Sequence, residues 1–195
     1  MSKTLEYFFD YVSPYSYLGD SQIAGLVERT GCELVYRPFF LGGVMNASGN
    51  SPPATVPAKG KYMFADMSRW LGRYGLDFKF NPHFPVMTVK AMRGALVAQE
   101  QGVFPAYHAA MFQAMWRDEK NLADAAVLSE VVAAAGIDPE KLLGRIGDDD
   151  VKERLKANTE EAVARGAFGA PTFFLGDEMF FGNDRLDFVE EALRG

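Results

Sequence analysis

The first thirty residues of the chain change abruptly from the pattern of a strand to the pattern of a helix. Residues 5–12 are rich in aromatic strand formers and stop at Ser13-Pro14. A helical pattern follows at once, from Tyr15 to Arg29. Serine is a favoured N-cap residue, and proline is tolerated at the first helical position because its missing amide hydrogen is not needed there. The sequence therefore predicts a tight strand-to-helix corner at Ser13.

The chemistry of such a corner favours anions. A side chain placed there faces unpaired backbone amides and the positive end of the helix dipole. Thiol–disulfide enzymes put Cys-x-x-Cys at this kind of corner, where the pKa of the first thiol is lowered. Here the four positions read Ser13-Pro14-Tyr15-Ser16, so a hydroxyl stands at both thiol positions. The pattern indicates either a simple helix cap or a site that stabilises a thiolate carried by a cofactor.

Composition limits the class of protein. The 195 residues are 48% hydrophobic and 24% charged, which fits one domain, or one domain with a large insertion. A net charge of −6 offers no basic surface for nucleic acid or anionic membranes. Cys32 is the only cysteine, so an internal disulfide and a dithiol redox cycle are excluded. With no signal-peptide layout and no run of about 18 apolar residues, we expect a cytoplasmic protein without membrane or nucleic-acid partners.

The middle of the chain is predicted to be helical. A second strand, residues 33–40, completes a βαβ unit whose strands should be parallel. Residues 41–53 are dense in Gly, Asn, Ser and Pro, and we expect a loop. Helices are expected at residues 59–74, 88–102, 105–116, 124–136, after Asp138, and at 148–165. In the helix at 59–74, the side chains expected to face inward are Tyr62, Met63, Met67 and Trp70.

The tail returns to strands. Residues 172–175 and 178–181 flank Gly176-Asp177 and indicate a hairpin, followed by a helix at 186–193 that Asn183-Asp184 would cap. The order β-α-β, helices, β-β-α is that of an α/β, thioredoxin-like fold with a large all-helical insertion. We assign residues 1–42 and 167–195 to the thioredoxin-like domain and 43–166 to the insertion, within a single compact unit.

The thioredoxin-like fold carries a cis X-Pro bond just ahead of its hairpin, against the first helix. We therefore predict that Ala170-Pro171 is cis, although generic X-Pro bonds are cis in only about 5–6% of cases. The backbone N–H and C=O of Ala170 would then be exposed beside Ser13. An extended peptide-like ligand such as glutathione could pair there in the manner of a strand.

Five segments carry a more specific resemblance. They are residues 10–17 (DYVSPYSY), 48–53 (SGNSPP), 59–62 (KGKY), 169–172 (GAPT) and 181–185 (FGNDR). In this order, and over essentially the whole length, the chain resembles the family of 2-hydroxychromene-2-carboxylate isomerases and kappa-class glutathione transferases, relatives of the disulfide oxidoreductase DsbA. The resemblance implies glutathione as cofactor and a homodimer.

The resemblance also implies site residues. Ser13 would be catalytic, its hydroxyl donating a hydrogen bond to the glutathione thiolate. Asn183 and Asp184 would bind the γ-glutamyl end, although both could simply cap the last helix. Apart from the resemblance, Lys59 and Lys61 border the loop and could neutralise carboxylates or merely be solvated. The predicted glutathione-binding residues are Pro14, Tyr15, Asn50, Lys59, Ala170, Pro171, Asn183 and Asp184.

Aromatic side chains and possible metal ligands are two further groups of site candidates. Aromatic residues could wall a substrate pocket or belong to the core; they are Tyr15, Tyr17, Trp70, Phe84 and Trp116. His83 and His108 are too few and too far apart to suggest a metal centre, and Asp148–Asp150 is typical of a helix start. No metal is expected.

The leading hypothesis is glutathione-dependent isomerisation of 2-hydroxychromene-2-carboxylate to trans-o-hydroxybenzylidenepyruvate, a step of bacterial naphthalene breakdown with a small aromatic acid as substrate. Ser13 would stabilise the thiolate rather than attack, because no neighbouring histidine activates its hydroxyl. The alternatives are a kappa-like transferase that leaves glutathione on its product, and a non-catalytic binding protein of the same fold. A dithiol oxidoreductase is disfavoured because positions 13 and 16 lack cysteine.

Overall fold

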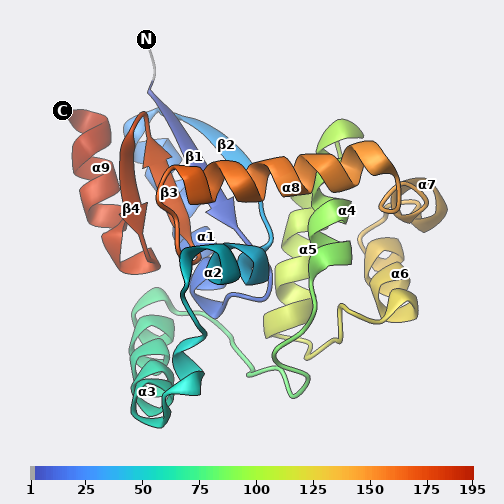
Figure 1. Cartoon of the computed structure of the whole chain (residues 1–195), viewed down its shortest axis with the longest axis horizontal. Helices are drawn as coiled ribbons and strands as arrows, with labels where there is room; N and C mark the ends of the chain where they lie inside the picture. The colour runs from blue at the N-terminus through green and yellow to red at the C-terminus, as the bar shows by residue number, and fades with distance from the viewer. Residues whose placement is uncertain (1–2) are drawn as a thin grey trace.

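The computed structural model describes residues 3–195 and contains, within them, a four-stranded mixed sheet (Figure 1). The strands are β1 (Thr4–Phe9), β2 (Glu33–Pro38), β3 (Thr172–Leu175) and β4 (Glu178–Phe181), in the order β2-β1-β3-β4. β1 is parallel to β2 and antiparallel to β3, and β4 is antiparallel to β3. The predicted thioredoxin-like α/β fold is confirmed.

Alternation along the central strand β1 buries both faces of the sheet. Leu5, Tyr7 and Phe9 point into a large core shared with several helices, whereas Phe8 points into a smaller core on the opposite face. Tyr7 stacks on Phe173 of β3, with ring centroids 4.9 Å apart. The aromatic run that predicted a strand therefore supplies the centre of the molecule.

The helices follow the predicted order within a few residues. They are α1 (Pro14–Thr30), α2 (Leu41–Ser48), α3 (Pro57–Tyr74), α4 (Val89–Glu100), α5 (Phe104–Trp116), α6 (Ala125–Ala134), α7 (Pro139–Leu143), α8 (Asp149–Ala164) and α9 (Leu186–Arg194). Figure 1 shows α8 crossing the front of the sheet, α4 to α7 beside it, and α3 at the lower left. No helix within residues 3–195 is both long and apolar enough to cross a membrane.

The predicted division into residues 1–42 with 167–195, and 43–166, stays a prediction. Its boundary at residue 42 falls inside α2, and residues 1 and 2 lie outside the described part of the chain.

The prediction of a loop across residues 41–53 is wrong for its first half, which forms α2. Leu41 and Val44 are buried in the smaller core, and this burial favours a helix despite the two glycines. The glycines give room rather than break the helix: a Cβ at Gly43 would lie 3.3 Å from Thr159 Cγ2. β2 correspondingly ends two residues earlier than predicted.

The predicted inward face of α3 is correct except for Tyr62. Met63 and Met67 are buried and Trp70 is half-buried, but Tyr62 is 63% exposed. Neighbouring residues of a helix point about 100° apart, so Tyr62 and Met63 cannot both face the same partner. Tyr62 lies instead over the surface near the guanidinium of Arg69.

Candidate functional site

The strand-to-helix corner forms as predicted, and Ser13 is its N-cap. The Ser13 side chain is buried, and its Oγ accepts a hydrogen bond from the Ser16 amide at 3.1 Å. The same hydroxyl donates to the carbonyl oxygen of Ala170, also at 3.1 Å. The Ala170-Pro171 bond is cis, which confirms that prediction. The Ser13 side chain thus joins the start of α1 to the segment just before β3.

The second thiol position is also a buried hydroxyl. Ser16 Oγ has no hydrogen-bond partner anywhere in residues 3–195. The Ser16 carbonyl accepts a hydrogen bond from the Tyr7 hydroxyl at 2.9 Å, which ties the first turn of α1 to β1. At Ser16 the backbone carbonyl is therefore hydrogen-bonded, whereas the side-chain oxygen makes no hydrogen bond to the described part of the fold.

A cavity of about 620 Å³ opens at the corner. The predicted site residues that line it are Ser13, Pro14, Tyr15, Asn50, Lys59, Ala170, Asn183 and Asp184. Pro171 is not part of the lining and lies toward Gly19 of α1, behind Ala170. The cavity brings together segments that are far apart in sequence, although Ser13's catalytic role and the glutathione contacts stay predictions.

Part of the cavity lining is polar: Asn183 and Asp184 come from the short 3-10 turn Asn183–Arg185 that precedes α9. Asn183 is only 2% exposed, and its Nδ2 finds no hydrogen-bond partner among residues 3–195. The Asp184 carboxylate pairs with Arg185 at 2.7 Å. The alternative that these residues only cap the last helix is wrong, because the N-cap position of α9 is Arg185 and carries no side-chain cap.

Asn50 and Lys59 border the cavity from the segment between α2 and the first turn of α3. Asn50 Nδ2 donates to the Phe168 carbonyl at 2.7 Å. Lys59 is exposed, and within residues 3–195 it is the only basic residue of the lining. The lining also contains Asp66 and Asp184, so its charges are one positive and two negative.

Tyr15 lines the cavity one residue beyond Pro14. Burial raises the pKa of Tyr15 to about 12, and the negative charge of Asp66 adds to the rise. The phenol is therefore neutral at physiological pH and can donate a hydrogen bond into the cavity.

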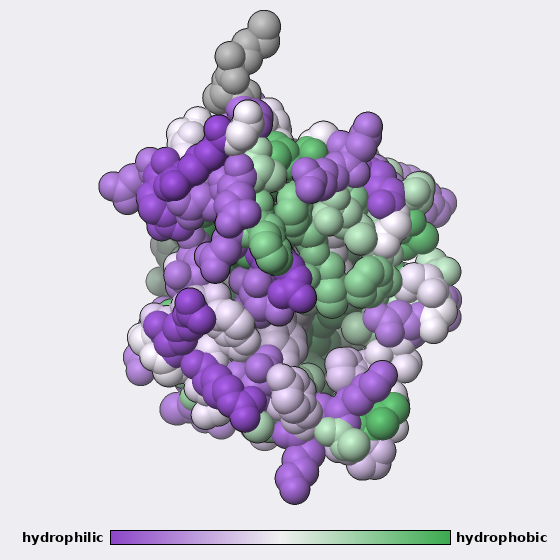
Figure 2. All heavy atoms as spheres, turned by 90° about the vertical axis from the view of Figure 1, so that its left-hand side faces the viewer, coloured by the Kyte–Doolittle hydropathy of each residue, from purple (hydrophilic) through white to green (hydrophobic). Residues whose placement is uncertain are grey.

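Most of the remaining wall is apolar. The side chains come from α2, from α3, from the segment before α4, and from the two ends of the hairpin; they are Met45, Met63, Trp70, Phe84, Val86, Met87, Phe168 and Phe181. Phe168 and Phe181 pack with centroids 4.4 Å apart, and a Cβ at Gly169 would lie 2.6 Å from the Phe181 ring. Figure 2 views the molecule from the left-hand side of Figure 1. On this face hydrophobic residues gather next to a hollow between α3 and the sheet.

Sequence reasoning found only part of this wall. Of the proposed aromatic candidates, Tyr15, Trp70 and Phe84 line the cavity. Trp116 is instead fully buried in the larger core. The Tyr17 hydroxyl donates at 2.8 Å to a backbone carbonyl in the loop after α3, and its side chain is not part of the lining.

The apolar residues that sequence reasoning missed include Phe168 and Phe181. Phe168 directly precedes the GAPT segment, and Phe181 begins the FGNDR segment. Their adjacency to two site motifs was a usable signal, because residues next to a site residue in an extended chain lie close to the same cavity.

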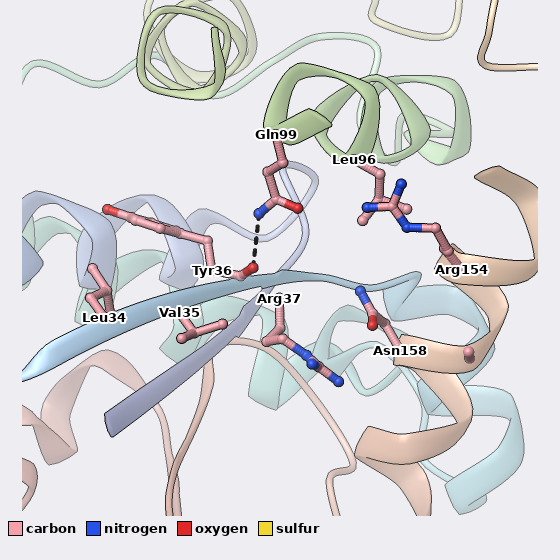
Figure 3. Close-up of a pocket in the computed structure, with 9 residues that line it drawn as sticks. Leu34, Val35, Tyr36, Arg37, Leu96, Gln99, Arg154 and Asn158 are labelled. Carbon is pink, nitrogen blue, oxygen red and sulfur yellow. Dashed lines mark hydrogen bonds between the residues drawn. The ribbon is translucent and has the colours of Figure 1, made fainter. Parts of the chain in front are cut away.

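A second cavity, of about 530 Å³, lies at the edge of β2 between α4 and α8 (Figure 3). Gln99 and Asn158 donate to edge carbonyls of β2, at 2.9 and 2.8 Å. The two arginines of this cavity, Arg37 and Arg154, are already paired with glutamates of α8 and α4. These contacts cover the exposed edge of β2 and pair both arginines, so the polar groups of this cavity need no ligand to account for them.

The two histidines lie apart in the fold. His108 is buried, with Nε2 2.8 Å from Asp20 Oδ1 and Nδ1 3.1 Å from the Tyr11 hydroxyl oxygen. His83 is exposed in the loop before α4, where its backbone amide donates to Asn81 Oδ1 at 2.9 Å. No three His, Cys, Asp or Glu side chains in residues 3–195 are grouped in a way that could hold a metal ion.

Comparison with known proteins identifies relatives of this chain. A family model described as a DsbA-like thioredoxin domain matches residues 4–194. A 2-hydroxychromene-2-carboxylate isomerase of Sphingobium xenophagum is 33% identical over 195 residues, covering 99% of each chain. A glutathione S-transferase kappa 1 of Caenorhabditis elegans is 31% identical, covering 97% of this chain and 90% of the relative.

The fold is similar to a solved structure as well. The structure of a 2-hydroxychromene-2-carboxylate isomerase superposes with a TM-score of 0.87 at 28% sequence identity, covering 97% of this chain and 94% of the other.

Proposed function

We propose that this chain, which belongs to the DsbA-like thioredoxin family and within it to the group of 2-hydroxychromene-2-carboxylate isomerases and kappa-class glutathione transferases, is a glutathione-dependent isomerase. The reaction proposed is the interconversion of 2-hydroxychromene-2-carboxylate and trans-o-hydroxybenzylidenepyruvate. The observation that carries the proposal is the cavity at Ser13, where a thiolate-stabilising corner without a thiol meets polar lining residues and an apolar wall.

The residues present fit a bound tripeptide. Asn183 offers a buried amide donor that has no partner within residues 3–195, which suits a carboxylate at the γ-glutamyl end. Asp184 can pair with an amine there, and Lys59 can neutralise the carboxylate at the other end. The backbone of Ala170 lies beside Ser13, where the middle of the tripeptide would pair with it.

When bound, glutathione supplies a thiolate that can add reversibly to a conjugated double bond. The chain's own contribution is electrostatic. The Ser13 proton, which points to the Ala170 carbonyl, would turn toward the anion, while Oγ keeps the bond from the Ser16 amide. Together with the N-terminus of α1, a hydrogen bond to a charged group stabilises the anion by about 1–3 kcal/mol.

A kappa-like transferase is the second candidate, and the charges of the cavity favour it. Lys59 is the only basic residue of the lining within residues 3–195, and glutathione itself would use it. An uncharged electrophile would fit the apolar wall without needing a second cation.

The assay that tests the proposal follows the absorbance of 2-hydroxychromene-2-carboxylate with and without glutathione. Glutathione-dependent conversion, with no glutathione retained in the product by mass spectrometry, is the expected result. A product that keeps glutathione supports the transferase. Absence of glutathione binding by calorimetry, together with no thermal upshift at millimolar glutathione, contradicts both enzyme proposals. The homodimer belongs to the same proposal, and sedimentation of the purified protein tests it.

A further inference from the structure

Asp10 is a fully buried carboxyl group at the end of β1, three residues before Ser13. Its Oδ1 accepts hydrogen bonds from the Val12 amide at 3.1 Å and from the Thr88 hydroxyl at 2.5 Å. Its Oδ2 accepts from the Leu41 amide at 2.9 Å. A carboxylate suits this place because all three partners are donors.

The three partners of Asp10 belong to three different segments that line the cavity. Val12 stands just before the corner, Leu41 is the first residue of α2, and Thr88 ends the segment that precedes α4. All three segments line the cavity, through residues that include Met45 on α2 and Met87 before α4. One buried carboxyl group therefore joins three segments that are far apart in sequence.

The residues proposed to hold the two ends of glutathione come from other segments. Asn183 and Asp184 come from the turn after β4, and Lys59 comes from the start of α3. Of the hydrogen bonds of the Asp10 side chain within residues 3–195, those from Leu41 and Thr88 go to segments of the apolar wall. The bond from the Val12 amide stays at the corner, next to Ser13. Asp10 itself does not line the cavity, so it would act on a ligand only through the residues that it holds.

We propose that Asp10 is a positioning residue that sets the shape of the apolar, substrate-side wall through Leu41 and Thr88, with a smaller effect on the glutathione-side contacts. The division into two sides rests on the proposed function, while the hydrogen bonds of Asp10 do not. Burial raises the pKa of Asp10, and the bonds from Thr88, Leu41 and Val12 oppose that rise.

Two variants weaken different bonds of this junction. In Asp10→Asn the amide keeps one acceptor oxygen but presents N–H to the Leu41 amide, which removes the link to α2. Thr88→Val removes the hydroxyl donor to Asp10 and keeps the shape of a side chain that itself lines the cavity. The matched control is Tyr107→Phe, which deletes a buried hydrogen bond to the carbonyl of Ala91, on α4 and away from the cavity lining.

The experiment measures two affinities by calorimetry and fluorescence: that of S-methylglutathione, and that of 1-aminoanthracene, an uncharged aromatic probe. We expect Asp10→Asn and Thr88→Val to weaken binding of the aromatic probe at least fivefold and to change S-methylglutathione affinity less than twofold. With the chromene acid as substrate, KM should rise at least fivefold, with a smaller change in kcat. Tyr107→Phe should change neither affinity by more than twofold.

Equal weakening of both ligands, or the same loss of probe affinity in Tyr107→Phe, would overturn the inference. So would unchanged probe affinity in both variants. If Asp10→Asn does not fold, Thr88→Val carries the test alone. Failure of the wild-type protein to bind S-methylglutathione counts against the proposed function instead, since the aromatic probe still reports on the wall.

Discussion

The Ser13 hydroxyl donates to the Ala170 carbonyl across 157 positions of the chain, at 3.1 Å. A hydroxyl has one proton, so this bond and a bond to an anion in the cavity exclude each other. In this structure the Ser13 proton is donated to the Ala170 carbonyl, and Ser13 Oγ accepts a hydrogen bond from the Ser16 amide. The corner is therefore preorganised around an oxygen whose proton can turn.

Replacement of Ser13 by alanine should lower turnover with little effect on glutathione affinity. Loss of about 1–3 kcal/mol of anion stabilisation corresponds to a fall in kcat of about fivefold to 150-fold. Loss of the N-cap should also lower the free energy of unfolding by about 1 kcal/mol. Steady-state kinetics, calorimetry with glutathione and urea denaturation measure the three effects.

Ser16→Ala is the matched control. Ser16 Oγ is buried and makes no hydrogen bond within residues 3–195, so its removal should leave kcat and stability unchanged or slightly raise stability. If Ser13→Ala retains wild-type kcat, Ser13 has no part in the mechanism.

Lys59→Met should weaken glutathione binding about tenfold, because it removes a positive charge from the cavity lining. Salt should reduce the difference between wild type and variant, since Lys59 is exposed and its charge is screened. The control is Lys61→Met, an exposed lysine two residues along α3 that does not line the cavity. Equal losses in the two variants would point to a general surface-charge effect.

Local signals predicted much of this molecule. Ser13-Pro14 marked the start of α1, and Gly176-Asp177 marked the hairpin, because a cap or a tight turn depends on a few adjacent residues. Residues 41–48 were beyond such reasoning, since Gly43 allows close packing against Thr159, which lies far along the chain on α8. The three bonds of Asp10 are similarly invisible in the sequence, since two of its partners lie 31 and 78 positions away.

Gly94→Ala should destabilise the protein by about 2–3 kcal/mol, because overpacking a rigid core forces neighbours to move. An added Cβ would clash with the Tyr107 hydroxyl oxygen, which is itself bonded to the Ala91 carbonyl. Tyr107→Phe in the same chain should restore part of the loss. Chemical denaturation with urea measures each step.

Gly72→Ala is the matched control for this substitution. Gly72 is an exposed glycine inside α3, and a Cβ there would meet nothing within 4 Å among the described residues. Alanine should stabilise the helix by about 0.5–1 kcal/mol. A Gly94→Ala variant as stable as wild type would show that α4 and α5 can separate without cost.

Stability should fall as the pH rises above about 10, because burial keeps tyrosines protonated in the folded protein. Burial raises the pKa of Tyr15 to about 12, and it raises the pKa of Tyr7, Tyr11 and Tyr107 further. A raised pKa means that the folded state binds the proton more tightly, so the stabilisation is complete below the unfolded value of about 10 and is lost through the folded value. Urea denaturation at pH values from about 8 to about 11.5 should show stability falling with pH, and Tyr15→Phe should release one proton fewer on unfolding. Absorbance of the native protein in the near ultraviolet checks the same point: phenolate from Tyr15 at a pH of about 10 would contradict its burial in the cavity wall.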